Sequence, residues 1–304
     1  MDEYAYIALE NGAMAFSLER IRSEEVERAR NRIRRDFLDE LLMGKITSKE
    51  TLSNLADLHG INLSLDYTAI IFPVTCLDYR NEKNLVLRNQ LENSKMKKLL
   101  KHFDYLALET KEAEIIFSRK KQIILLVGTH AIQTSQMKEY ALEIITQVEE
   151  EFPEVKLSAA IGKTVPHISQ INESFHQAQE TLRLGEGKQT KDAHRVFHFN
   201  EFIVQHLLVN HVSQIELRKF FYQALGEVHQ YDHEHQAALI ETLDCLVDHQ
   251  LNIAETSRAL FIHRNTLLYR IEKIEALLQI DLKDAEELLK IQLALKIHHL
   301  LDLE

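Results

Sequence analysis

The stretch that decides the fold of this chain lies near its C-terminus and reads Asn252-Ile-Ala-Glu-Thr-Ser-Arg-Ala-Leu-Phe-Ile-His-Arg-Asn-Thr-Leu-Leu-Tyr-Arg-Ile-Glu-Lys-Ile-Glu275. Its first part predicts a short helix that ends near Leu260, because Asn252 can cap the free backbone N–H groups and Glu255 completes a capping box. Its second part predicts another helix, whose apolar residues recur every three or four positions and share one face. These residues are Leu267, Ile271, Ile274 and, just beyond the stretch, Leu278.

The second helix and the corner before it carry side chains whose chemistry suits a nucleic acid. Arginine bonds guanine bidentately, asparagine does the same for adenine, and threonine, tyrosine and lysine can hold phosphates. In helix-turn-helix proteins the second helix lies in the major groove and its N-terminal residues reach the bases. A solvated helix face beside an ordinary turn is the alternative, because helix pairs are common in all-α proteins. The candidate DNA-binding residues are Arg258, His263, Arg264, Asn265, Thr266, Tyr269, Arg270 and Lys273.

The run Ala259-Leu-Phe-Ile-His-Arg-Asn-Thr-Leu-Leu-Tyr-Arg-Ile271, with Leu293-Ala-Leu295 in a last helix, resembles the C-terminal helix-turn-helix of PucR and CdaR transcriptional regulators. The His-Arg-Asn-Thr run is the most specific part. The resemblance covers about residues 30 to 304 and implies a GGDEF-like central domain. Phe261 stands where many turns of the similar Fis type carry glycine, so we expect it to have a positive φ.

Composition predicts a folded, helix-rich chain. The 304 residues are 45% hydrophobic and 27% charged, which is ordinary for two domains with cores of their own, and only 8 glycines and 3 prolines leave little material for a turn-rich β fold. Cys76 and Cys245 are far apart in apolar contexts, which predicts buried, reduced thiols. No apolar run is long enough for a bilayer and the N-terminus has no basic signal-peptide region, so we expect a cytoplasmic protein without membrane contact.

The expected fold class is α+β and helix-rich, with a central α/β sandwich followed by an all-α helix-turn-helix domain. The order of elements predicts five segments. They are a remnant of an upstream region at 1–20, a helical connector at 21–45, a GGDEF-like domain at 46–186, a helical linker at 187–236 and the DNA-binding domain at 237–304.

The connector is a strongly helical segment with an impure apolar stripe from Leu18 through Ile33 to Leu41. Such a stripe fits a helix docked on the next domain, and it also fits a two-helix coiled coil that would join two copies of the chain. Gly44 follows as a natural helix C-cap.

The central segment predicts a buried strand over Tyr67–Thr75 and a hairpin over Glu114–Val127. In an active diguanylate cyclase the hairpin turn would carry glycines and metal-holding acids, whereas here it is Ser118-Arg-Lys-Lys121, which cannot hold magnesium. Gly162-Lys-Thr164 follows a strand like a phosphate-binding loop, but Leu157 occupies the place of the required first glycine. We therefore expect a non-catalytic domain, no cofactor and no metal site.

The sequence predicts a sequence-specific transcriptional regulator of a metabolic operon. It would bind double-stranded DNA as a homodimer or higher oligomer and could respond to a small-molecule metabolite. Because the net charge is −11, the DNA contact must be a local basic surface. Two alternatives stay open: a nucleotide-using, cyclase-like enzyme built on the central domain, and a helical protein-interaction adaptor.

Overall fold

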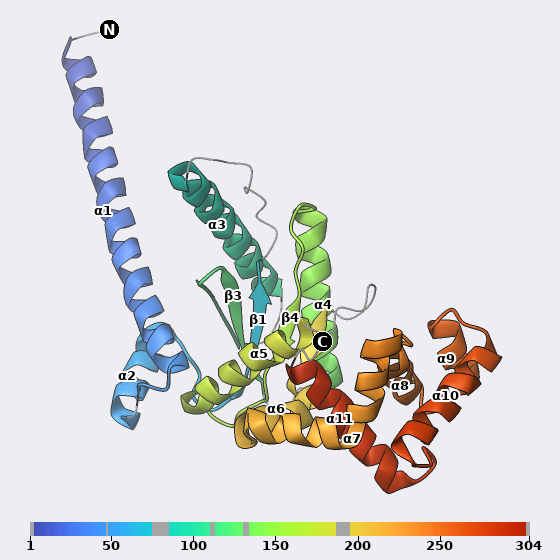
Figure 1. Cartoon of the computed structure of the whole chain (residues 1–304). Helices are drawn as coiled ribbons and strands as arrows, with labels where there is room; N and C mark the ends of the chain where they lie inside the picture. The colour runs from blue at the N-terminus through green and yellow to red at the C-terminus, as the bar shows by residue number, and fades with distance from the viewer. Residues whose placement is uncertain are drawn as a thin grey trace. The chain divides into compact units, whose positions relative to one another are not determined.

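The computed structural model describes residues 3–46, 48–74, 85–109, 113–129, 134–186 and 195–301. The chain forms two compact units (Figure 1). The N-terminal unit comprises Met1–Arg183 with Thr190–Glu201, and the C-terminal unit comprises Leu184–Gln189 with Phe202–Glu304. The N-terminal unit contains a small mixed sheet and the C-terminal unit is helical, so the expected helix-rich α+β class is confirmed. Among the described residues, no helix combines the length and the apolar character that a membrane span requires.

The N-terminal unit alternates helices and strands along the chain. Its elements are α1 (Glu3–Leu42), α2 (Lys49–His59), β1 (Asp66–Pro73), α3 (Leu85–Glu109), β2 (Ala113–Arg119), β3 (Gln122–Thr129), α4 (Thr134–Glu151), β4 (Ala159–Ile161), η1 (Ile168–Gln170), α5 (Ile171–Glu186) and β5 (Val196–His198). The five strands form one sheet in the order β2-β3-β1-β4-β5. All neighbouring pairs are antiparallel except β4 and β5. The short strand β5 was not expected from the sequence.

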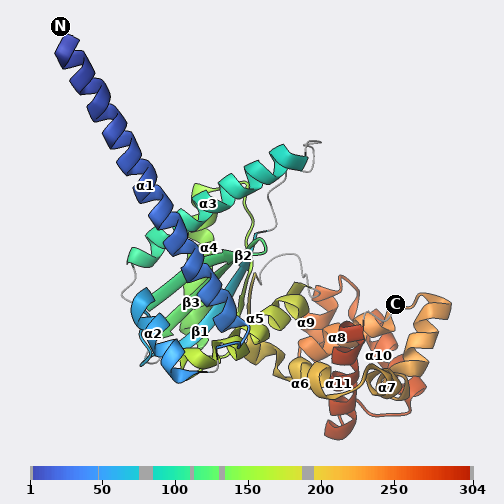
Figure 2. The ribbon, with the colours of Figure 1, turned by 90° about the vertical axis from the view of Figure 1, so that its left-hand side faces the viewer.

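Helices cover both faces of this sheet, as Figure 2 shows for α1, α2 and α5 on one side and α3 and α4 on the other. Side chains of β1 alternate between two cores: Tyr67, Ala69 and Ile71 enter one, whereas Ile70 and Phe72 enter the other. A strand buried on both faces needs apolar residues at consecutive positions. The buried strand predicted over Tyr67–Thr75 is therefore confirmed as β1 as far as Pro73, and Thr75 lies outside the described residues.

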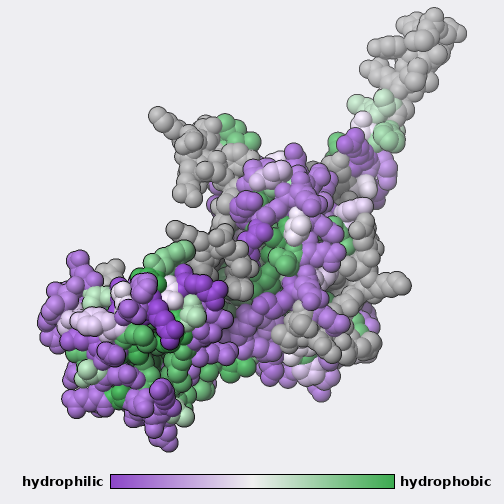
Figure 3. Space-filling model, turned by 90° about the vertical axis from the view of Figure 1, so that its right-hand side faces the viewer, coloured by the Kyte–Doolittle hydropathy of each residue, from purple (hydrophilic) through white to green (hydrophobic). Residues whose placement is uncertain are grey.

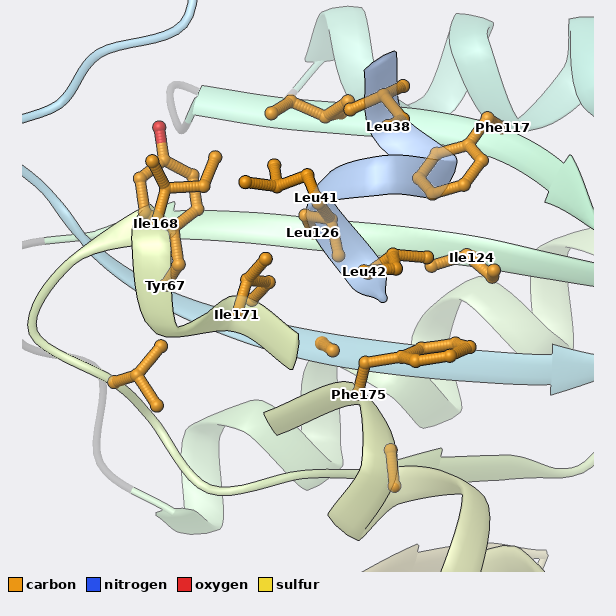
Figure 4. Close-up of a cluster of buried hydrophobic side chains, with 14 of the residues drawn as sticks. Leu38, Leu41, Leu42, Tyr67, Phe117, Ile124, Leu126, Ile168, Ile171 and Phe175 are labelled. Carbon is orange, nitrogen blue, oxygen red and sulfur yellow. The ribbon is translucent and has the colours of Figure 1, made fainter. Parts of the chain in front are cut away.

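The first core joins the end of α1 to the sheet and to α5 (Figure 4). Leu38, Leu41 and Leu42 of α1 lie over Leu126 of β3, and Phe175 of α5 packs from the neighbouring side. Gly44 then ends α1 with φ +65°, as its expected role of C-cap requires.

The predicted hairpin is β2–β3, with Arg119 paired to Gln122 across a two-residue turn. Both turn residues, Lys120 and Lys121, have positive φ, the conformation of the tight hairpin turn that usually carries glycine or asparagine. The Lys121 ammonium lies 2.8 Å from a carboxylate oxygen of the buried Glu92, so this lysine fastens the turn to α3.

Helix α1 is continuous through the segments expected as an upstream remnant and a connector. Figures 1 and 2 show its N-terminal part projecting beyond the sheet of the same unit. Its last two turns enter a core, through Phe37, Leu38, Leu41 and Leu42. Leu18, Ile21 and Ile33 are each more than half exposed, so the expectation of a helix docked along its stripe is wrong for most of its length.

The C-terminal unit consists of helices around one core. They are α6 (Ile203–His211), α7 (Gln214–His235), α8 (Leu239–Asp248), α9 (Ile253–Ala259), α10 (Arg264–Leu278) and α11 (Ala285–Leu301), preceded by η2 (Phe199–Phe202). Helix α7 lies within the segment expected as a linker, yet it contributes Leu217, Phe221, Leu225 and Val228 to the same core as α8, α10 and α11. The expected domain boundaries stay predictions.

Of the two cysteines, Cys76 lies outside the described residues. Cys245 is a half-buried free thiol on α8. Burial, together with Asp248, Asp244 and Glu241 nearby, raises the pKa of this thiol above its ordinary value of 9.0. A thiol held in its neutral form is a poor nucleophile, which agrees with the reduced thiol expected for it.

Candidate nucleic-acid interface

The predicted helix pair is α9 and α10, and both helices begin at side-chain caps. The Asn252 side-chain oxygen accepts hydrogen bonds from the backbone N–H groups of Ala254 at 3.1 Å and Glu255 at 3.3 Å. At the second helix the Nδ1 atom of His263 accepts from the N–H of Asn265 at 3.2 Å. The sequence predicted the first cap, whereas it indicated His263 only as a DNA contact.

The corner between the helices is a Schellman motif. The N–H of Phe261 donates to the carbonyl of Arg258 at 3.2 Å, and the N–H of Ile262 donates to that of Ser257 at 3.0 Å. In this motif the residue after the cap adopts the left-handed conformation, and the φ of Phe261 is +53°. The positive φ expected at this position is confirmed.

Helix α10 rests on the core of the C-terminal unit through the face that its spacing predicted. Leu267 and Ile274 are fully buried, and Ile271 and Leu278 are partly buried against the same core. Because four anchors on one side fix the rotation of a helix about its axis, the side chains of the opposite side are held toward solvent.

Six of the eight candidate residues are exposed around the corner and the first two turns of α10. They are Arg258, His263, Arg264, Asn265, Thr266 and Tyr269. The positive end of the α10 dipole adds to the charges of Arg258 and Arg264 at this point. The exposed cluster therefore offers cationic groups, an amide and a hydroxyl to a large anionic partner, and a long polyanion with base edges fits that set.

The other two candidates, Arg270 and Lys273, contact other helices of the unit, whereas the Nε atom of Arg258 donates to the Ala254 carbonyl of its own helix at 3.1 Å. The Arg270 guanidinium donates to the Thr242 hydroxyl at 2.9 Å, and Thr242 on α8 is fully buried. The Lys273 ammonium lies over the ring of Tyr231 on α7, 4.5 Å from its centroid. The sequence could have indicated that Arg270 faces the unit, because it lies three residues after Leu267 and four before Ile274, beside the buried stripe.

Glu272, which was not among the candidate residues, shares the exposed side of α10. Glu272 is exposed and lies three residues after Tyr269 and seven after Asn265, so it belongs to the same helical face. A carboxylate here repels phosphates, although it can accept from the amino group of cytosine. The surface that suits DNA is thus confined to the first two turns of α10 and the corner before it.

Comparison with known proteins gives matches to two family models. Residues 239–297 match the PucR C-terminal helix-turn-helix domain, and residues 43–184 match the GGDEF-like domain. The first match contains the helix pair and its exposed cluster, and the second contains strands β1 to β4 of the sheet but not β5.

Three curated relatives extend this comparison. The chain is 28% identical to the DNA-binding transcriptional activator AdeR of Bacillus subtilis over 67% of this chain and 49% of that protein. It is 24% identical to the purine catabolism regulatory protein of Bacillus subtilis over 99% of this chain and 55% of that protein. It is 26% identical to the carbohydrate diacid regulator of Escherichia coli over 51% of this chain and 39% of that protein. The chain spans about half the length of the curated relatives it matches.

Proposed function

The chain is a member of the PucR/CdaR family of transcriptional regulators, with a GGDEF-like domain and a PucR-type helix-turn-helix, and we propose that it regulates transcription by binding a specific DNA site through α10. The observation that carries the proposal is the exposed cluster around the first turns of α10, held in place by the buried stripe beneath it. The names of its relatives describe regulators of metabolism, so a metabolic operon is the proposed target. The proposal places the protein in the cytoplasm with its DNA.

The proposed contacts divide by chemistry. Arg264 and Asn265, on the first turn of α10, would read base edges in the major groove, where each bidentate pair contributes about 1–3 kcal/mol of discrimination. Arg258, His263, Thr266 and Tyr269 would hold phosphates on either side. The DNA contacts predicted for Arg270 and Lys273 stay predictions. Within the unit, Arg270 contacts Thr242 on α8 and Lys273 contacts Tyr231 on α7, so both residues help to hold α10 in place.

Duplexes selected by the protein from a random-sequence pool test this function. Asn265→Ala should cost about 1–3 kcal/mol at one base position, whereas Arg258→Ala should weaken all duplexes alike and lower the slope of log affinity against log salt by about one. Lys290→Ala, which removes an exposed charge from α11 of the same unit, is the matched control and should leave the sequence preference unchanged. Equal affinity of Arg264→Ala, Asn265→Ala and the unchanged protein for the selected duplex would rule the function out.

The projecting part of α1 supports dimerisation as part of this proposal. Met14, Leu18 and Ile21 are each more than half exposed and follow the four- and three-residue spacing of a coiled-coil seam. The space-filling view shows apolar side chains on this projecting stalk (Figure 3). A second copy of the helix would cover them, and a dimer suits the two-fold sites that helix-turn-helix proteins bind.

Sedimentation equilibrium tests the coiled coil. The double variant Leu18→Glu, Ile21→Glu should be monomeric at concentrations where the unchanged chain is dimeric, because each carboxylate would have to be buried in the seam. Ser23→Glu adds one carboxylate on the opposite side of α1 and should leave the dimer intact. A dimer that survives the double variant excludes α1 as the interface.

The enzyme alternative is disfavoured by chemistry. The turn that would hold metal in a cyclase consists here of Lys120 and Lys121. The Lys121 ammonium forms an ion pair with Glu92. Incubation with GTP and magnesium, followed by chromatography for a cyclic dinucleotide, tests this alternative, and any product would overturn the non-catalytic assignment. A metabolite effector stays a prediction.

A further inference from the structure

The strained corner of the helix pair carries a side chain that the fold itself does not use. Phe261 is 95% exposed, so it buries almost no apolar surface, and its φ of +53° is a conformation that residues with a Cβ adopt at a cost. An exposed large apolar residue is common on its own, and so is a left-handed polar residue at a helix end. Phe261 combines both features, so neither burial of its ring nor the backbone geometry of the corner explains a phenylalanine at this position.

The same pair of hydrogen bonds ends three other helices. The left-handed residue is glycine at the ends of α1 and α2, Gly44 with φ +65° and Gly60 with φ +68°, and it is the exposed Gln250 with φ +53° at the end of α8. At the corner of the helix pair the equivalent residue is Phe261. Glycine avoids the strain and glutamine keeps a polar side chain in water, whereas the exposed ring of Phe261 does neither, which indicates that it serves a partner outside the unit.

The surroundings of Phe261 decide which partner fits. Its direct neighbours Leu260 and Ile262 are half-buried, and apart from the small Ala259 the exposed residues near it along the chain are polar or cationic: Arg258 before it, and His263 and Arg264 after it. A protein-docking surface would need further apolar side chains around the aromatic ring. A single ring among cations fits duplex DNA, where the cations meet phosphates and the ring meets the one apolar group of the major groove, the thymine methyl.

We propose that Phe261 is a specificity-determining residue that packs against a thymine methyl group at the edge of the site read by α10. The inference rests on the proposed DNA-binding function and adds to it a base preference carried by an apolar contact. In this proposal the strained backbone of the corner serves to position the ring, because the left-handed conformation directs the Phe261 side chain away from the core on which α10 packs.

The test uses the full chain and a duplex that it selects from a random-sequence pool, with each thymine replaced in turn by deoxyuridine. Loss of the methyl group should weaken binding of the unchanged protein about fourfold at one thymine, which corresponds to about 0.8 kcal/mol for one buried methyl-sized group. Phe261→Gly should bind the thymine duplex more weakly and should show no loss at any deoxyuridine. Phe261→Leu, which keeps an apolar side chain, should retain part of the sensitivity.

A matched control separates the contact from the backbone strain. Gln279 is exposed, has φ +55° and caps the far end of α10. Phe261→Gly and Gln279→Gly should each leave the melting temperature of the C-terminal unit unchanged or raise it by a few degrees, because glycine relieves the left-handed strain. Only Phe261→Gly should change the response to deoxyuridine, since a merely structural effect of glycine would not remove a methyl-dependent contact.

The outcomes distinguish this inference from the function on which it rests. If Arg264→Ala and Asn265→Ala weaken binding while Phe261→Gly keeps the full sensitivity to thymine, the phenylalanine contact is refuted and the DNA-binding function stands. If none of these variants changes binding, the function itself fails. A Phe261→Gly protein with a melting temperature several degrees lower would contradict the argument from strain.

Discussion

Gly162 shows how closely two elements of the N-terminal unit approach at a single residue. Its N–H donates to the carbonyl of Ala69 on β1, and the hydroxyl of Ser174 on α5 accepts from the N–H of Ala69 at 2.9 Å. A Cβ on Gly162 would lie 2.0 Å from the backbone oxygen of Ser174 and 2.6 Å from its hydroxyl. Because Ser174 is fully buried, its backbone has no free space into which to move.

Gly162→Ala is therefore expected to destabilise the N-terminal unit by about 3 kcal/mol or more, since overpacking against backbone cannot be relieved by a rotamer change. Gly226, within α7, is the control, because an added Cβ there would meet only Tyr222 atoms at 3.7 Å. Gly226→Ala should stabilise its helix by up to about 1 kcal/mol. Differential scanning calorimetry of both variants checks the pair, and a Gly162→Ala protein as stable as the unchanged chain would refute the close approach.

At the scale of the element, α9 depends on its cap. It is a helix of 7 residues, too short to be stable by propensity alone, and the Asn252 side chain satisfies two of its free N–H groups. The backbone carbonyl of Asn252 also accepts from the N–H and from the hydroxyl of Thr256. One residue thus organises the start of the helix that supports the corner.

Asn252→Ala should lower the free energy of unfolding of the C-terminal unit by about 1 kcal/mol, because two backbone N–H groups lose their protein partner. Asn252→Asp keeps an accepting oxygen at the same place and should be close to neutral. Chemical denaturation followed by circular dichroism measures both variants. An alanine variant with unchanged stability would mean that solvent replaces the cap without cost.

At the scale of the whole molecule, stability should depend on pH through a histidine in the core of the C-terminal unit. The rings of His298 on α11 and Phe221 on α7 are stacked, with centroids 5.3 Å apart. Burial, and then the neighbouring His299 and His229, lower the pKa of His298 below its ordinary value of 6.5, while Asp244 acts in the opposite sense. The folded chain therefore takes up a proton less readily here than the unfolded chain.

The consequence has a definite sign. The stabilising effect of neutral His298 is complete above about pH 6.5 and is lost as the pH falls toward the lowered pKa. His298→Leu should therefore reduce the fall in melting temperature of the C-terminal unit between about pH 7.5 and about pH 5.5. His233→Leu, which changes an exposed histidine of α7, is the control. An equal fall in the His298→Leu and unchanged proteins would contradict the assignment.

The proposed function requires the whole molecule to bind a polyanion despite its own net charge of −11. The match to the PucR helix-turn-helix lies in the C-terminal unit, and the surface proposed for DNA is the corner with the first turns of α10. A small basic surface on an acidic protein limits non-specific binding, because few phosphates can be neutralised at once. Specific contacts such as those proposed for Asn265 and Phe261 then contribute a larger share of the affinity.

The sequence by itself determined the features that depend on neighbours within about four residues. The Asn252 cap, the buried stripe of α10 and the positive φ at Phe261 all follow from such local spacing, and the tertiary structure confirms each. The uninterrupted apolar run of β1 likewise required burial on both faces, whatever covers them. These patterns fix which elements form and which side of each is buried.

Only the tertiary structure decided which residues meet across the chain. Arg270 binds Thr242, 28 residues earlier, and Lys273 covers Tyr231, so two of the eight candidates contact other helices of the unit, whereas the other six are exposed. It also decided that α7 joins the core of the C-terminal unit and that the stripe of α1 is uncovered along most of its length. A periodic pattern states that a face is apolar, but the identity of its partner depends on the packing of elements distant in sequence, which local spacing does not encode.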